Sequence, residues 1–225
     1  ITRKIFMRQR EATGGTAEMI KAGIIGSTGY AGGELVRILM NHKEVEIKWY
    51  GSRSYIDKKY YQVYRNMFEI VEDICKDDNL VELAQQEDVI FTATPQGFLA
   101  GILTEEILNK VKIVDLSADY RIKDVEIYEK WYGIEHKSPQ FIEEAVYGLC
   151  EVNREAVKKA RLIANPGCYT TCSILTIYPL AKEGLTPYEI LQRYYGDDIN
   201  IITNAPIEKI EESYPGAPLQ VGDAG

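Results

Sequence analysis

The sequence has few of the residues and patterns that mark metal sites, disulfide frameworks or membrane spans. It contains only two histidines and four cysteines among 225 residues, and no two cysteines have the Cys-x-x-Cys spacing. Scattered cysteines of this kind indicate neither a disulfide framework nor a zinc site, so we predict no metal. No apolar run approaches the ~18 residues that a membrane-spanning helix needs.

Positive charge is also in short supply. The chain has 26 lysines and arginines against 34 acidic residues, which gives a formal net charge of −8. Nucleic acids and anionic membranes would not be attracted to such a surface. The composition agrees with a soluble intracellular protein, so we predict a cytoplasmic protein that binds neither nucleic acid nor a membrane.

The most informative segment that is present runs from Asn165 to Tyr169, with the sequence Asn-Pro-Gly-Cys-Tyr. It follows a short apolar run and opens a long apolar segment, so Cys168 is predicted on a strand-to-helix turn. Unpaired N–H groups at a helix N-terminus favour a thiolate, and they also suit an oxyanion on a carbonyl that sulfur attacks. Cys168 is therefore a candidate nucleophile. A buried cysteine of the packed core is the alternative.

A glycine-rich turn lies far upstream of this cysteine. Residues 20–25 are predicted to form a buried strand, and residues 34–41 have apolar positions with helical spacing. Glycines between a strand and a helix let the backbone approach a pyrophosphate, whose charge the helix N-terminus binds. An ordinary glycine-rich turn is the alternative. The candidate cofactor-binding residues here are Gly26, Ser27, Thr28, Gly29, Tyr30, Ala31 and Gly32.

The end of the next strand, predicted over residues 45–50, indicates which dinucleotide is bound. An acidic residue near this point usually holds the 2′-hydroxyl of the ribose. Here the strand runs into Gly51-Ser52-Arg53-Ser54, which has no carboxylate. A hydroxyl and a guanidinium suit a 2′-phosphate, so Ser52 and Arg53 predict NADP as the cofactor. Taken alone, Arg53 would be interpreted as a solvated loop cation.

The middle of the chain alternates between predicted strands and helices. Helices are predicted over residues 80–86 and 98–108, strands over 89–93 and 111–116, and residues 57–79 have no clear assignment. The alternation predicts an α/β fold, a Rossmann-like parallel sheet with helices on both faces. Ligands bind at the carboxyl ends of such strands, which adds Thr94 and Pro95 to the candidate cofactor-binding residues.

Seven segments in this order resemble the N-acetyl-gamma-glutamyl-phosphate reductases, a family of arginine biosynthesis. The resemblance covers about residues 19–185, and the Asp-Leu-Ser-Ala-Asp-Tyr-Arg and Asn-Pro-Gly-Cys-Tyr segments separate it from the aspartate-semialdehyde dehydrogenases. The segments are Gly26–Gly32, Ser52–Ser54, Thr92–Gly97, Asp115–Arg121, Tyr128–Gly133, Tyr147–Leu149 and Asn165–Tyr169.

This resemblance implies an NADP-dependent reduction of N-acetylglutamyl 5-phosphate to the 5-semialdehyde. By matched position, Cys168 would be the nucleophile that displaces phosphate and carries the thioacyl intermediate. The turn from Gly26 to Gly32, with Ser52 and Arg53, would hold NADP. The family forms homo-oligomers, which we do not expect of this chain because most of the substrate domain has no counterpart in it.

The resemblance stops before two segments of the family. A Ser-Gly-x-Ser-Gly-Ala-Gly-Arg segment and a His-Arg-His-x-Pro-Glu segment, whose histidine acts as the general acid and base, have no counterpart. His42 and His136 do not match that position and are interpreted as surface or loop histidines. We therefore expect impaired activity. A non-catalytic nucleotide-binding fragment and a cell-wall interaction protein are the alternatives.

These observations predict four parts of the chain. Residues 1–18 are predicted to be a disordered leader, and residues 19–165 an NADP-binding domain. Residues 166–185 are predicted to form the catalytic-cysteine helix, a remnant of a truncated substrate domain. Residues 186–225, an acidic, proline-rich and irregular tail, weakly resemble the linker before a clostridial peptidoglycan-binding repeat.

Overall fold

The computed structural model describes residues 19–185, and the chain divides after Pro166 into two units that are described separately. The predictions for residues 1–18 and 186–225 lie outside the described residues.

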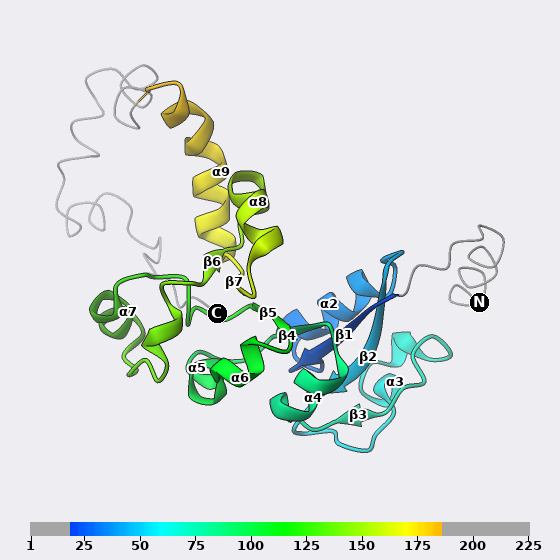
Figure 1. The fold of residues 1–225 in the computed structure, drawn as a ribbon. Helices are drawn as coiled ribbons and strands as arrows, with labels where there is room; N and C mark the ends of the chain where they lie inside the picture. The colour runs from blue at the N-terminus through cyan, green and yellow to red at the C-terminus, as the bar shows by residue number, and fades with distance from the viewer. Residues whose placement is uncertain (1–18, 186–225) are drawn as a thin grey trace, which may run out of the picture. The chain divides into compact units, whose positions relative to one another are not determined.

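The first unit is built on a parallel sheet. Over residues 19–166 the sheet has seven strands in the order β3-β2-β1-β4-β5-β7-β6 (Figure 1). From β1 the chain adds β2 and β3 on one side, and then returns to place β4 on the other side of β1. Ligands bind outside the carboxyl ends of strands at such a reversal of strand order. The strands are β1 (Ile20–Ile25), β2 (Val45–Gly51), β3 (Cys75–Lys76), β4 (Val89–Thr92), β5 (Lys112–Asp115), β6 (Val146–Tyr147) and β7 (Leu162–Ala164).

Both faces of the sheet are covered, as the α/β prediction requires. Successive side chains of a strand point to opposite faces. Accordingly, the fully buried Ile24 belongs to one hydrophobic cluster and its neighbour Ile25 belongs to another. Residues of α2 and α3 join the Ile24 cluster, and residues of α4, α5 and α6 join the Ile25 cluster. The helices of this unit are α2 (Tyr30–Leu39), α3 (Tyr60–Val63), α4 (Leu80–Gln86), α5 (Phe98–Ile102), α6 (Glu105–Leu108), α7 (Val125–Tyr132) and α8 (Cys150–Lys159), with the 3-10 turns η1 (Arg65–Met67) and η2 (Pro139–Phe141).

The single helix predicted over residues 98–108 is wrong, because the structure has two short helices there. Leu103 ends α5 with an extended backbone, at φ −70° and ψ 132°. Thr104 then begins α6, where its side-chain oxygen accepts a hydrogen bond from the Ile107 N–H at 3.4 Å. Threonine competes in this way for N–H groups that a continuous helix would use. Apolar spacing runs through the break and conceals it.

The segment that could not be assigned, residues 57–79, folds against the Ile24 face. It contains α3, η1 and β3, the last paired with the end of β2. Tyr60 is fully buried, and its ring lies 5.1 Å from that of Tyr50 and 5.4 Å from that of Tyr64. Tertiary packing of these rings, rather than hydrophobic periodicity, therefore defines the segment.

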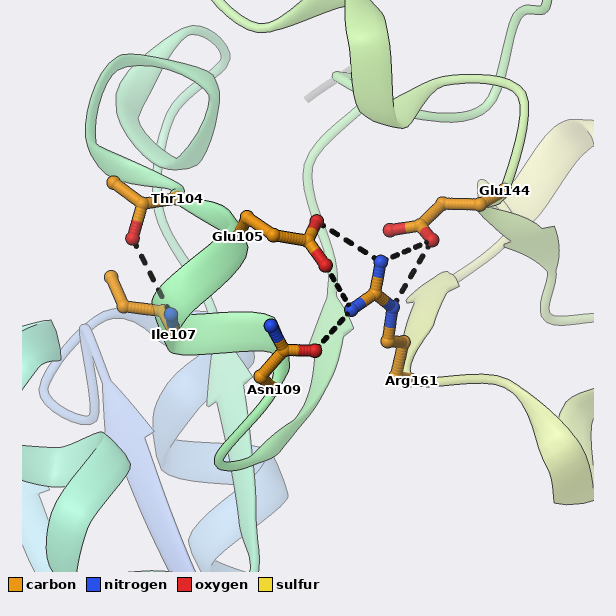
Figure 2. Close-up of polar contacts among 6 residues, drawn as sticks. All are labelled: Thr104, Glu105, Ile107, Asn109, Glu144 and Arg161. Carbon is orange, nitrogen blue, oxygen red and sulfur yellow. Dashed lines mark hydrogen bonds and ion pairs between the residues drawn. The ribbon is translucent and has the colours of Figure 1, made fainter.

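An ion cluster joins α6 to the start of β7 at the amino ends of the strands (Figure 2). The Arg161 guanidinium donates to both carboxylate oxygens of Glu105, at 2.6 and 3.1 Å, and to Asn109 Oδ1 at 2.8 Å. It also donates to Glu144 from two nitrogens, at 2.7 and 3.1 Å. These hydrogen bonds raise the pKa of Arg161, and the cation therefore stays charged. The cluster lies at the amino ends of the strands, whereas ligands of such folds bind at the carboxyl ends, so its role is structural.

In the described part of the second unit the chain forms α9 (Cys168–Lys182). The helix begins after Gly167, and Gly184 follows it in the left-handed conformation, at φ 79°. None of the residues of α9 is buried. Cys172, one turn after Cys168, is exposed. No other described element of this unit packs against it.

Candidate functional site

The glycine turn after β1 is close-packed, and two of its glycines are required by that packing. Gly26 adopts φ 75°, and a Cβ built on it would collide with the Ala93 carbonyl oxygen. A Cβ on Gly32 would collide with the Gly26 carbonyl oxygen. At Gly29 the nearest atom to a Cβ would be the same carbonyl oxygen at 3.4 Å, which is nearly an ordinary contact. Gly26 and Gly32 therefore allow the strand end, the turn and the helix to lie close together.

Hydroxyl groups from the 57–79 segment hold the carbonyl groups of this turn. Tyr60 donates to the Ser27 carbonyl at 2.9 Å, and Tyr64 lies 3.1 Å from the Thr28 carbonyl and 3.0 Å from the Gly29 carbonyl. Burial raises the pKa of both phenols, so both remain donors at neutral pH. Gly29 precedes α2 without a side-chain cap, and the N–H groups of the first turn therefore stay available to an anion. Tyr30 and Ala31, the first two residues of that helix, are exposed.

The end of β2 lies beside this turn. Ser27 donates from N and Oγ to the Gly51 carbonyl at 2.8 and 2.9 Å, and Thr28 Oγ1 lies 2.7 Å from Ser52 Oγ. Arg53 lies over the ring of Phe98, 4.5 Å from its centroid, and its Nε lies 3.2 Å from Asp78 Oδ2. Arg53 is therefore a partnered cation, although its side chain is largely exposed. Asp78 follows β3, so sequence distance concealed a carboxylate that the fold brings to this turn.

The turn after β4 completes the group of predicted cofactor-binding residues in the first unit. Thr94 lies next to Gly26, since its Cγ2 would be 3.6 Å from a Cβ built there. The Thr94 hydroxyl is buried and has no hydrogen-bond partner. Pro95 is exposed, and its carbonyl accepts from the Phe98 N–H at 3.3 Å. A buried hydroxyl without a partner at the point of strand reversal fits a ligand group.

Two aspartates, one at the end of β5 and one in the turn that follows, hold these turns in place, and the sequence reasoning missed both roles. Asp119 is fully buried and accepts from the Gly97 N–H at 2.7 Å, the Ala100 N–H at 3.1 Å and the Tyr128 hydroxyl at 2.8 Å. Asp115, also fully buried, accepts from the hydroxyls of Thr92 and Ser117, both at 2.6 Å. Burial raises the pKa of Asp115 to about 6, against the opposing effect of these hydrogen bonds. The signal in the sequence was two acidic residues in an otherwise apolar and small-residue segment.

His136 belongs to the same buried network: it lies in a loop, as expected, but it is not at the surface. It is 4% exposed, and its ring lies edge-on to those of Tyr120 and Tyr128, at 5.4 and 5.0 Å. Nδ1 accepts from the Ser138 N–H at 3.3 Å, which leaves the proton on Nε2, 2.7 Å from the Asp119 carbonyl oxygen. These contacts give His136 a structural role. His42 is exposed, as expected.

Arg121 links the β5 turn to the segment that leads to the cysteine. Its Nε donates to the Asn165 carbonyl at 2.7 Å, and a terminal nitrogen donates to the Leu116 carbonyl at 2.6 Å. The Asn165 N–H in turn donates to the Asp115 carbonyl at 2.8 Å. Both backbone groups of Asn165, its carbonyl and its N–H, are therefore hydrogen-bonded to the end of β5 and the turn after it.

Cys168 is the first residue of α9, and it is exposed. Gly167 precedes the helix without a side-chain cap, and its carbonyl accepts from Thr171 N at 3.0 Å and from Thr170 Oγ1 at 2.9 Å. The alternative of a buried core cysteine is therefore wrong. The structure groups the turn residues, Ser52, Arg53 and Thr94 in the first unit, whereas Cys168 belongs to the second.

Residues 21–160 match the family described as semialdehyde dehydrogenase, NAD binding domain. The chain belongs to this family. The first-unit fold agrees, because aspartate semialdehyde dehydrogenase II from Vibrio cholerae, complexed with ASA, superposes with a TM-score of 0.52 at 17% identity over 73% of this chain and 47% of that one. The enzyme from Francisella tularensis gives a TM-score of 0.51 at 16% identity, over 74% of this chain and 42% of that one. The Rossmann-like prediction is confirmed.

Relatives found by sequence identify the family more narrowly than these structures do. An N-acetyl-gamma-glutamyl-phosphate reductase of Lachnoclostridium phytofermentans is 74% identical over 167 residues, which is 74% of this chain and 48% of the relative. The reductase of Lachnospira eligens is 66% identical over 168 residues, and one from Campylobacter jejuni is 50% identical over 170 residues, each again covering 48% of the relative. The family resemblance is confirmed, and the chain spans about half the length of these relatives.

Neither a membrane span nor a metal cluster is found in the part of the chain that the structure describes. Among residues 19–185 no helix combines the length and the apolar character needed to cross a membrane. The same residues contain no group of three or more histidine, cysteine or acidic side chains placed to hold a metal ion.

Proposed function

We propose that this chain acts in the NADP-dependent reduction of N-acetylglutamyl 5-phosphate to the 5-semialdehyde. The observation that carries the proposal is the 74% identity to an N-acetyl-gamma-glutamyl-phosphate reductase. The first unit would bind the cofactor, and Cys168 of the second would react with the substrate. Cytoplasmic localisation stays a prediction, and so does the expectation that the chain does not form the homo-oligomer of its family.

The turn residues fit a dinucleotide. Gly26 and Gly32 leave room where side chains would fill the cradle, and the uncapped start of α2 offers N–H groups to a pyrophosphate. Ser52 and Arg53 would hold the 2′-phosphate, and the unpartnered Thr94 hydroxyl would meet a polar group of the ligand. When bound, the cofactor supplies a hydride.

Cys168 would carry out the acyl-transfer step. Its thiolate sulfur attacks the carbonyl carbon of the acyl phosphate, the carbon–oxygen bond to phosphate breaks, and phosphate leaves with the electron pair. The product on the protein is a thioester, which accepts hydride far more readily than a carboxylate does. The uncapped N–H groups at the start of α9 would stabilise the oxyanion that forms during attack.

The acyl-transfer step has a direct test. The whole chain is incubated with N-acetylglutamyl phosphate, quenched in acid and mapped by mass spectrometry. We expect a thioester on Cys168 and none in Cys168→Ser, with Cys150→Ser as the matched control that keeps the adduct. Dinucleotide binding without any adduct on Cys168 would instead support the non-catalytic nucleotide-binding alternative.

The cofactor assignment is tested separately by titrating NADPH and NADH against the whole chain. We expect tighter binding of NADPH, and we expect Arg53→Ala to weaken NADPH binding about tenfold while leaving NADH unchanged. Arg154→Ala is the control, since Arg154 is an exposed residue of α8. Equal affinity for the two cofactors in the unaltered chain would contradict the NADP assignment.

A further inference from the structure

The fold places a carboxylate, that of Asp78, directly against Arg53. Asp78 lies two residues beyond β3, and its Oδ2 is 3.2 Å from Arg53 Nε. The Asp78 side chain is 9% exposed, whereas the Arg53 side chain is 68% exposed. The carboxylate therefore lies inside the protein and the guanidinium lies over it, toward solvent.

The second oxygen of Asp78 is unusual. Asp78 Oδ1 is buried and has no hydrogen-bond partner, and it packs so closely on Gly51 that a Cβ there would lie 2.8 Å away. Desolvation raises the pKa of Asp78, with the Gly26 N–H and Arg53 opposing that rise. A buried charge of this kind is weakly screened by salt, so it acts on any anion bound at the same turn.

Arg53 does not depend on Asp78 alone for its position. The guanidinium carbon lies 4.5 Å from the centroid of the Phe98 ring, within the range of a cation–π contact. Loss of the carboxylate would therefore remove a negative charge while Phe98 still holds the cation. The Arg53–Asp78 pair has a formal charge of zero, and Arg53 without Asp78 has a charge of +1.

We infer that Asp78 sets the cofactor preference of this site, because its carboxylate neutralises Arg53 and weakens the preference for a 2′-phosphate over a 2′-hydroxyl. This inference rests on the proposed binding of NADP(H). A phosphate monoester has a charge of about −2 and is repelled by the carboxylate, whereas a neutral hydroxyl is not. The site therefore binds NADPH less selectively than an arginine without a counter-ion would.

The test compares the dissociation constants of NADPH and NADH for the whole chain and its variants by calorimetry. We expect Asp78→Asn to bind NADPH about tenfold more tightly and NADH within about twofold of the unaltered chain. Asp77→Asn is the matched control, because the adjacent Asp77 is exposed and its carboxylate accepts from the Asn79 N–H at 3.4 Å. We expect no change in that control. In an Arg53→Ala background, Asp78→Asn should give no comparable gain for NADPH.

Three outcomes overturn the inference. If Asp78→Asn weakens NADPH selectively, Asp78 positions Arg53 instead of opposing the phosphate. If it changes neither cofactor, or both equally, Asp78 does not set the preference, although the proposed function stands. If the unaltered chain binds neither cofactor, the inference about Asp78 and the proposed binding of NADP(H) are both wrong. Asp78→Ser removes the same charge, and circular dichroism of both variants identifies any effect that comes from misfolding.

Discussion

Two strand-to-helix turns of this chain share a plan and differ in how they are held. The turn after β1 leads into α2 and the turn after β7 leads into α9, each through a glycine and neither with a side-chain cap. The first turn is held by hydroxyls of Tyr60 and Tyr64, which come from more than 30 residues along the chain. The second places Cys168 in an exposed position after a single glycine. In the proposed function, the first turn would bind the cofactor and the second would present the nucleophile.

The largest expected effect concerns cysteine reactivity, which distinguishes the second turn from the rest of the molecule. We expect Cys168 to be alkylated by limiting iodoacetamide about a hundredfold faster than Cys75, which is fully buried and must await local opening. Burial also raises the pKa of the Cys75 thiol. Mass-spectrometric mapping of the four cysteines measures the rates.

Cys150 sharpens this test, because it too is exposed and begins a helix. Its thiol donates a hydrogen bond to the Gly148 carbonyl, with Sγ 3.5 Å from the oxygen. Cys150 should therefore react more slowly than Cys168. Equal labelling of the two would show that the second turn confers no special reactivity.

The next effect concerns Asp115, whose network lies between the two turns. Its pKa is about 6 in the folded state against an ordinary value of 3.8, so the folded protein binds this proton more tightly than the unfolded chain does. The stability from this group is present below about pH 4 and is lost as the pH rises through about 6. The two-unit difference corresponds to about 3 kcal/mol.

Denaturant unfolding at several pH values tests this prediction. We expect the free energy of unfolding of the unaltered chain, relative to that of Asp115→Asn, to fall between about pH 4 and pH 6 and then level off. The comparison uses the change in the free energy of unfolding with pH, so a pH-independent loss of stability caused by the substitution does not affect it. Parallel curves for the two proteins would refute the assignment to Asp115.

A smaller effect is expected from changing a glycine of the first turn. Gly32→Ala should lower the free energy of unfolding by about 1–3 kcal/mol, because the new methyl group collides with backbone that cannot move far. It should also weaken dinucleotide binding. Gly29→Ala is the control for the unfolding measurement, since a Cβ there meets its nearest atom at 3.4 Å. Equal effects of the two substitutions would show that the first turn is not tightly held.

The smallest effect is expected at the amino ends of the strands, where Arg161 joins Glu105 and Glu144 (Figure 2). The cluster is partly exposed, so Arg161→Ala should lower Tm by only about 2 °C, and less at high salt. Lys158→Ala, which removes an exposed pair with Glu155, should have no measurable effect. Neither variant should alter dinucleotide binding, because both lie away from the two turns.

Hydrophobic periodicity and glycine spacing identified most of the sheet. The strand predicted over residues 20–25 and the helix over 80–86 have the boundaries of β1 and α4. The helix predicted to begin at Glu34 begins at Tyr30, because glycines within α2 hide its first turn. Residues 57–79 were not assigned, since the contacts that define them reach the rings and carbonyl groups of distant residues.

In the candidate site, too, some residues could be identified from the sequence and others only from the structure. The sequence indicated each residue of the glycine turn, Ser52, Arg53 and Thr94, and the structure groups them. The acidic residues of the 115–119 segment stand out in the sequence, but their partners do not: Asp119 holds the turn after β4, and His136 is buried against the Asp119 carbonyl. Those roles depend on which groups meet in space, and polar residues have no periodic pattern that predicts their partners.

By itself, the sequence determined the alternation of strands and helices, the glycine turn and the start of a helix at Cys168, because each depends on local backbone preference and apolar spacing. Only the tertiary structure decided the electrostatics of the site. Asp78 is 25 residues from Arg53 in the chain, yet β3 lies beside β2 and brings the two into contact. Charges act through space and not along the chain, so the carboxylate beside Arg53 appears only once the sheet is formed.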